Sequence, residues 1–78
     1  MDTDDIQQRI QDLVEREQEL RDAGPDAGPE HAATLRRTEE QLDQLWDLLR
    51  QRRAKIDAGE NPDDAQVRPV DEVEGYRQ

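Results

Sequence analysis

Hydrophobic residues recur at helical spacing in two stretches of the chain. The first stretch has steps of four, three and seven residues, at Ile6, Ile10, Leu13 and Leu20. The second follows the same three-four pattern, at Ala32, Leu35, Leu42, Leu45, Trp46, Leu49 and Ile56. This spacing places the apolar side chains on one face of an α-helix. The pattern therefore predicts two helices, over residues 4–23 and 30–58.

The segment DAGPDAGP between the two predicted helices is rich in glycine and proline. Proline lacks the backbone N–H group that a helix interior needs, so we predict a turn over residues 24–29. Pro29 suits the first position of the second helix, with Gly28 as its N-cap and Gly59 as the residue that ends it. For the first helix, Thr3 is the expected N-cap because its hydroxyl can accept a backbone hydrogen bond.

A short turn between two apolar stripes predicts an antiparallel, coiled-coil-like helical hairpin, and hence an all-α fold class. One alignment satisfies both stripes, with paired residue numbers summing to 55. It pairs Leu20 with Leu35, Leu13 with Leu42, Ile10 with Leu45 and Ile6 with Leu49. The same alignment pairs the one polar residue of each stripe, because Glu17 falls opposite Thr38. Residues 1–58 are thus predicted to form the hairpin.

Residues 59–78 form an acidic C-terminal tail with six acidic and two basic residues. Asn61 followed by Pro62 is a helix-start signal, sufficient for one short helical turn. Farther along, apolar residues repeat every three positions, at Val67, Val70, Val73 and Tyr76. Two arrangements fit this repeat: the tail packs back on its own hairpin, or it reaches a second subunit.

A chain of 78 residues with 31% hydrophobic residues, no Phe and one Trp builds only a small core. Two helices cover their apolar stripes incompletely, while the backbone entropy lost on ordering them is large. We therefore predict a homodimer in a four-helix arrangement. Trp46, Leu48 and Leu49 are expected near its contact.

Composition excludes several classes of protein. The chain has no cysteine, which removes disulfides and thiolate metal sites. It has no apolar run near 18 residues and no basic, apolar N-terminal segment, so we expect a soluble, cytoplasmic protein with no membrane contact. Ten Arg residues against one Lys indicate a GC-rich coding genome.

Four cations lie within six residues near the end of the second predicted helix: Arg50, Arg52, Arg53 and Lys55. The favoured interpretation is that they complement the helix dipole and the Asp-rich start of the first helix. The alternative is contact with nucleic-acid phosphates. A net charge of −10 and the lack of an accompanying aromatic platform make nucleic-acid binding the weaker interpretation.

Catalytic and metal-binding patterns are missing from the sequence. The sole histidine, His31, is expected to be a solvated surface residue. A group of acids on the second helix is expected to form a solvated face without calcium-loop spacing: Glu39, Glu40, Asp43 and Asp47. The chain contains no Ser and no Gly-rich phosphate loop. We predict no enzymatic activity, no cofactor, no metal and no small-molecule substrate.

Two segments carry a family resemblance, LWDLLRQRRA at residues 45–54 and NPDDAQVRPVDEVEGY at residues 61–76. In these segments the chain resembles a family of short actinobacterial proteins of unknown function. The doubled DAGP turn is richer in Gly and Pro than this family implies. The resemblance implies a GC-rich bacterial origin and brings no activity, ligand or catalytic residue with it.

The sequence thus favours a small non-enzymatic protein that acts by protein–protein interaction or oligomerisation. The candidate interaction residues are Trp46, Arg50, Arg52, Arg53, Lys55, Val70, Val73 and Tyr76. The alternative function is a nucleic-acid or transcription-associated regulator that uses the basic cluster. The chain is also similar to the acidic actinobacterial ubiquitin-like degradation tag, but its end, GYRQ, departs from the Gly-Gly-Gln type of terminus.

Overall fold

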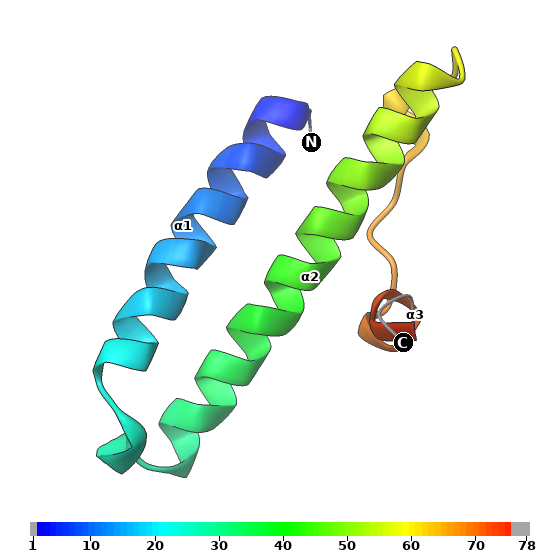
Figure 1. Ribbon diagram of the computed structural model, residues 1–78. Helices are drawn as coiled ribbons and strands as arrows, with labels where there is room; N and C mark the ends of the chain where they lie inside the picture. Colours follow the sequence, from blue (N-terminus) through cyan, green and yellow to red (C-terminus); the bar gives the residue numbers. More distant parts are fainter. Residues whose placement is uncertain (1, 76–78) are drawn as a thin grey trace.

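The computed structural model describes residues 2–75, and within them all regular structure is helical. The elements in chain order are α1 (Thr3–Asp22), η1 (Pro25–Ala27), α2 (Pro29–Asp57), η2 (Pro62–Asp64) and α3 (Val70–Gly75). The predicted all-α fold class is confirmed. Figure 1 shows α1 and α2 side by side and running in opposite directions, with α3 against the side of α2 away from α1.

Both long helices begin and end one residue earlier than the sequence predicted. Pro29 lies in the first turn of α2, after Gly28 as N-cap with a φ of 95°. Gly59 follows the end of α2 with a φ of 75°. Glycine adopts these positive φ values without the steric cost that a Cβ atom brings, so the local signals place the ends of α2.

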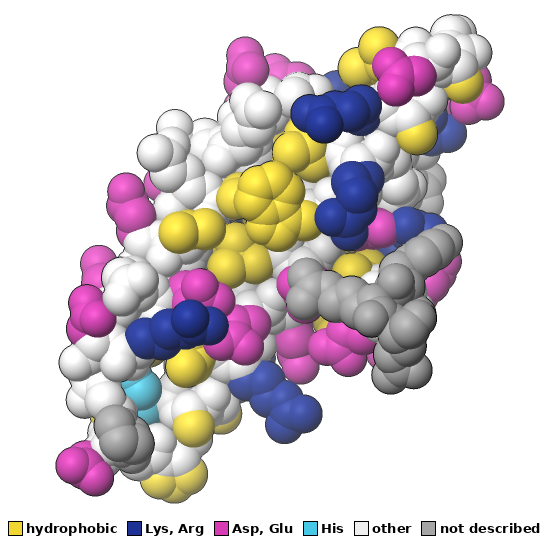
Figure 2. Space-filling model, in the orientation of Figure 1, with side chains coloured by type: hydrophobic (Ala, Val, Ile, Leu, Met, Phe, Trp, Pro, Cys, Tyr) yellow, Lys and Arg dark blue, Asp and Glu magenta, His cyan; other side chains and the backbone are white. Residues whose placement is uncertain are grey.

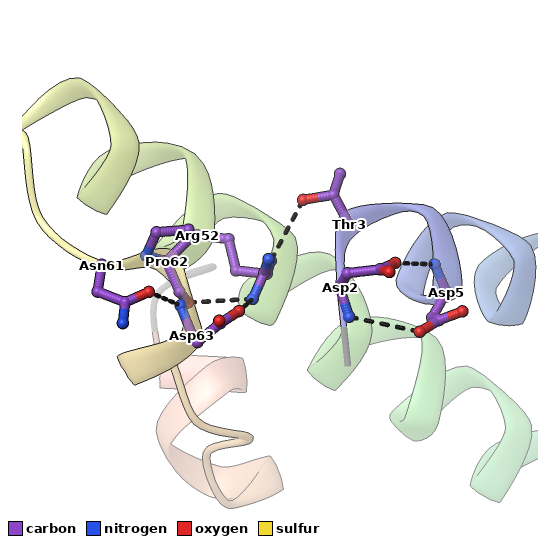
Figure 3. A network of polar contacts seen from close by, with 7 residues as sticks. All are labelled: Asp2, Thr3, Asp5, Arg52, Asn61, Pro62 and Asp63. Atoms are coloured by element: carbon purple, nitrogen blue, oxygen red, sulfur yellow. Dashed lines mark hydrogen bonds and ion pairs between the residues drawn. The ribbon is translucent and has the colours of Figure 1, made fainter.

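The N-cap of α1 is Asp2, and the prediction of Thr3 was wrong. The Asp2 carboxylate accepts a hydrogen bond from the backbone N–H of Asp5 at 2.9 Å, and the Asp5 carboxylate accepts one from the backbone N–H of Asp2 at 3.5 Å (Figure 3). Two acids three residues apart thus satisfy each other's backbone donors and lie at the positive end of the helix. Thr3 is left to interact with α2.

The core lies between α1 and α2. Its buried residues are Ile6, Ile10, Leu13, Leu42, Leu45, Leu48 and Leu49, with Ala65 of the tail packed against them. Leu48 and Leu49, which were expected near a dimer contact, are both buried within the chain. Ile56 belonged to the predicted stripe but is exposed, since α2 has 29 residues against the 20 of α1 and extends past it.

The tail returns along α2 of its own chain. The side-chain amide of Gln51 donates to the backbone carbonyl of Gln66 at 2.8 Å, and that of Gln44 donates to the carbonyl of Arg68 at 3.1 Å. Val73 in α3 is buried against this arrangement. Of the two arrangements that the sequence left open for the tail, the structure thus has the one in which it packs on its own chain.

Candidate interaction surface

A hollow opens between α1 and α2 on one face of the molecule. Its lining residues, which we call the Trp46 face, are Val14, Glu17, Arg21, Glu39, Leu42, Asp43 and Trp46. Trp46 is 42% exposed and Val14 is 45% exposed. Figure 2 shows hydrophobic side chains gathered at the middle of this face, with basic side chains beside them on the upper half of α2. Acidic and basic side chains mix below them.

The lower rim of the Trp46 face is a charged bridge between the two long helices. The Arg21 guanidinium on α1 lies 3.2 Å from a Glu39 carboxylate oxygen on α2 and 3.6 Å from a Glu17 carboxylate oxygen on its own helix. Thr38, which was paired with Glu17 in the sequence alignment, is buried and donates its hydroxyl to the backbone carbonyl of Thr34. Glu17 and Thr38 therefore each have a partner on their own helix, and the contact between α1 and α2 at this level is made by Arg21 and Glu39.

The structure splits the predicted basic cluster. The Arg52 side chain is only 7% exposed, and its guanidinium donates to the Thr3 hydroxyl, the Pro62 carbonyl and the Asp63 carboxylate at 3.0–3.2 Å (Figure 3). It thereby ties η2 and the start of α1 to α2, and it is not on the surface with its neighbours. Sequence reasoning missed this role because the tail had no assigned position.

The other three cations of the cluster lie at or near the surface. Lys55 pairs with Glu60 at 3.8 Å, just beyond the end of α2. Arg50 and Arg53 are exposed, and neither forms a hydrogen bond or an ion pair with any residue between positions 2 and 75. The exposed part of the predicted cluster therefore consists of these two arginines, which follow Trp46 on α2 by four and seven residues.

The sequence placed Asp47 on a solvated face of α2, and this prediction was wrong. The Asp47 residue is only 2% exposed. Both of its carboxylate oxygens accept hydrogen bonds from the Arg68 guanidinium, and Gln51 donates a further one at 2.8 Å. These hydrogen bonds, with that of Arg68 the largest influence, outweigh burial and hold the pKa of Asp47 below its ordinary value of 3.8. Asp47 is thus an ionised, structural carboxylate.

A sequence signal for this contact did exist. Gln44, Asp47 and Gln51 follow one another at steps of three and four residues, so they share a second face of α2. Arg68 is the one cation between residues 59 and 75. A polar stripe on a helix and a single opposite charge in the tail together indicate where the tail returns.

His31 is half-buried, and the prediction of a solvated surface histidine was wrong. Its Nε2 atom lies 2.5 Å from the backbone carbonyl oxygen of Leu20. That carbonyl belongs to the last turn of α1, where helix carbonyls lack intrahelical partners. His31 therefore links the first turn of α2 to the end of α1.

The tail candidates differ in exposure. Val73 is buried and Val70 is half-buried, so both serve the packing of α3. Tyr76 lies outside the described residues, as do Arg77 and Gln78, the other two residues that end the chain after Gly75. Val67, ahead of α3, is exposed.

The described part of the chain has neither a cluster of metal ligands nor a helix suited to a membrane. Between residues 2 and 75, no group of three or more His, Asp or Glu side chains comes together in a way that could hold a metal ion. No helix in the same range is long and apolar enough to cross a membrane. The features that remain are an apolar centre with a charged rim and a tail held by buried ion pairs.

Comparisons with known proteins agree with the sequence resemblance. The family described as "Protein of unknown function (DUF2630)" matches residues 2–78. The uncharacterised proteins Rv0898c of Mycobacterium tuberculosis (strain H37Rv) and Mb0922c of Mycobacterium bovis are each 51% identical over 70 residues, covering 86% of this chain and 80% of the relative. No solved structure matches the chain significantly. The family resemblance seen in the sequence is confirmed, and the chain belongs to the DUF2630 family of proteins of unknown function.

Proposed function

We propose that this chain is a small non-enzymatic helical protein that acts by binding a protein chain through the Trp46 face. One observation carries the proposal: Trp46, the sole tryptophan of the sequence, leaves 42% of its surface exposed beside the exposed Val14. Tryptophan is the residue type most enriched among those that dominate binding energy at protein interfaces. An apolar centre with a charged rim is also the usual anatomy of such interfaces.

The scaffold supports this role. We propose that α1 and α2 act as an antiparallel, coiled-coil-like hairpin whose inner face is the core and whose Trp46 face serves association. Arg21 and Glu39 connect the two helices at the rim of the hollow, so the surface is built on two mutually supported elements. A surface on paired helices presents its anchors with little loss of conformational freedom on binding.

A nucleic-acid role is not favoured by the contacts of the basic cluster. Arg52 is engaged by Thr3, Pro62 and Asp63, which leaves Arg50 and Arg53 as the exposed cations of the cluster. Two exposed arginines in this cluster, on a chain of net charge −10, provide few phosphate contacts, and phosphate neutralisation supplies most non-specific affinity for nucleic acids. Protein binding is therefore the single function that we propose.

The test is affinity capture of proteins from an actinobacterial lysate with the tagged wild-type chain and two variants. Trp46→Ala removes the proposed anchor, and we expect it to lose the proteins that the wild type retains. Ile56→Ala is the matched control, because Ile56 is also an exposed hydrophobic residue of α2, at 55%, but lies outside the Trp46 face. Circular dichroism verifies that both variants are folded. Equal capture by Trp46→Ala and the wild type would contradict the proposal.

A further inference from the structure

We infer that the occupant of the Trp46 face is a second copy of this chain. The two copies are related by a two-fold axis near Trp46, and their α2 helices run antiparallel across it. This inference rests on the proposed function of that face and names its partner. The order of charges along α2 favours a second copy as the partner.

Three residues of α2 lie on one line along the helix surface. Glu39, Trp46 and Arg53 are seven residues apart. Seven residues make almost two turns of an α-helix, so successive members are displaced by only about 20° around the axis. At about 1.5 Å per residue, the acid and the base lie roughly 10 Å from Trp46, on opposite sides of it.

A two-fold axis at Trp46 brings these charges together. In a two-fold symmetric interface every contact occurs twice. If one residue of the first copy contacts a different residue of the second copy, the same two residues also meet with the copies exchanged. Glu39 then faces the partner subunit's Arg53, while Arg53 faces the partner subunit's Glu39. The two tryptophans pack beside the axis, each with the neighbouring apolar surface of the other copy.

The same charges disfavour the competing parallel arrangement. With α2 helices parallel, Glu39 would face Glu39 and Arg53 would face Arg53. Like charges placed opposite each other across an interface weaken it and suppress that geometry. The order of acid, tryptophan and base therefore selects the antiparallel arrangement, which closes at two copies.

The groups required are accessible for these contacts. Arg53 is exposed and forms no hydrogen bond or ion pair within the described part of the chain. The Glu39 side chain is 43% exposed, and its contact with Arg21 uses one oxygen, Oε1. A carboxylate accepts several hydrogen bonds, so Glu39 can hold Arg21 and the partner subunit's Arg53 together. Arg50, one turn before Arg53, adds to the positive half of the stripe.

The test begins with sedimentation equilibrium of the full chain from about 1 to about 100 µM, the range in which a moderate dimer dissociates. We expect the apparent mass to rise from the 9.1 kDa of one chain toward twice that value. Trp46 is the only tryptophan, so its fluorescence should shift to the blue over the same concentrations. Trp46→Ala should raise the dimer dissociation constant at least about 30-fold.

A charge exchange gives the decisive comparison. Arg53→Glu places two pairs of like charges at the interface and should raise the dissociation constant about tenfold or more, and Glu39→Arg should act in the same way. The double variant Glu39→Arg/Arg53→Glu restores both pairs with reversed polarity, so its dissociation constant should fall well below that of either single variant. It stays above the wild-type value because both variants that carry Glu39→Arg lose the bridge to Arg21 within the subunit. The two positions are 14 residues apart on one helix, roughly 21 Å, so this rescue cannot arise within a subunit.

Arg37→Glu is the matched control. Arg37 is an exposed arginine of α2 whose position lies on the side of the helix opposite Trp46, nine residues away. It changes the net charge as Arg53→Glu does, and it should leave the dissociation constant unchanged. Thermal unfolding of each variant separates loss of association from loss of fold.

A wild-type chain that remains a monomer at about 100 µM overturns the inference, as does a double variant that dimerises no better than Arg53→Glu. If the wild type is monomeric but Trp46→Ala still abolishes capture from lysate, the face binds another protein, so the proposed function stands and the inference fails. If Trp46→Ala captures the same proteins as the wild type, the proposed function fails instead.

Discussion

Arg68 in the tail donates hydrogen bonds from two of its guanidinium nitrogens to the two carboxylate oxygens of Asp47 on α2, 21 residues earlier in the chain. The Nε to Oδ2 distance is 2.8 Å. Asp47 is buried and accepts a third hydrogen bond from Gln51. A two-pronged ion pair of this kind fixes both the position and the orientation of the tail on α2.

Asp47→Asn should destabilise the protein. The amide keeps the shape of the side chain but carries no charge, and its NH2 group cannot accept from Arg68. Because the Arg68 side chain keeps some exposure, we expect a loss of about 1–3 kcal/mol in the free energy of unfolding. Urea unfolding at pH 7 measures it. Asp12→Asn is the control, since Asp12 is exposed on α1 and should change stability by less than about 0.5 kcal/mol. Equal stability of the two variants would refute this role for Asp47.

Stability should also depend on pH through Asp47. The hydrogen bonds from Arg68 hold the pKa of Asp47 in the folded chain below its ordinary value of 3.8. The folded state therefore favours the ionised form, and its contribution is complete above the pKa of the unfolded chain. As pH falls below about 4, this contribution is lost through the folded pKa.

The measurement is urea unfolding of the wild type and Asp47→Asn at a series of pH values between 7 and 2. The difference in unfolding free energy between them should be constant at neutral pH and shrink at acidic pH. A difference that stays the same down to the lowest pH would show that ionised Asp47 does not stabilise the fold.

Arg52→Met should loosen the tail. Methionine retains an apolar stem of similar length but loses the donors to Thr3, Pro62 and Asp63. We expect a loss of about 2 kcal/mol in the free energy of unfolding, because three hydrogen bonds from a buried guanidinium, one of them to a carboxylate, are lost. Amide hydrogen exchange should speed up first in residues 62–68. Arg53→Met is the control and should leave the exchange of the tail unchanged, since Arg53 is exposed; equal exchange in both variants would contradict the assignment.

The two long helices could be predicted to within one residue because their signals are local. The apolar spacing from Ile6 to Leu20 repeats with the helix period, and Gly28, Pro29 and Gly59 punctuate the chain where the backbone needs them. The N-cap was misplaced by one residue because Asp2 and Thr3 are both competent acceptors. Only the reciprocal contact with Asp5 decides between them.

The position of the tail could not be predicted from periodicity. Asp47 and Arg52 look like ordinary charges of a solvated helix, and their burial depends on residues 62–68 returning to cover them. Leu48 was absent from the predicted apolar stripe for the same reason, because Ala65 of the tail packs on the core that contains it. Trp46 stood out in the sequence as the sole tryptophan, but its exposure follows from the tail covering a different side of α2.

The two glutamine bonds that hold the returning segment are made to backbone carbonyls, those of Gln66 and Arg68. Such a bond does not depend on the identity of the residue that supplies the oxygen, so the exposed position 66 is open to drift. Chain length is a different matter. Gln44 and Gln51 lie at fixed positions along α2. One residue inserted or deleted between Gly59 and Gln66 would therefore shift the later backbone carbonyls and the Arg68 side chain away from their partners on α2. Evolution of this segment is therefore constrained by its count of residues more than by their kind.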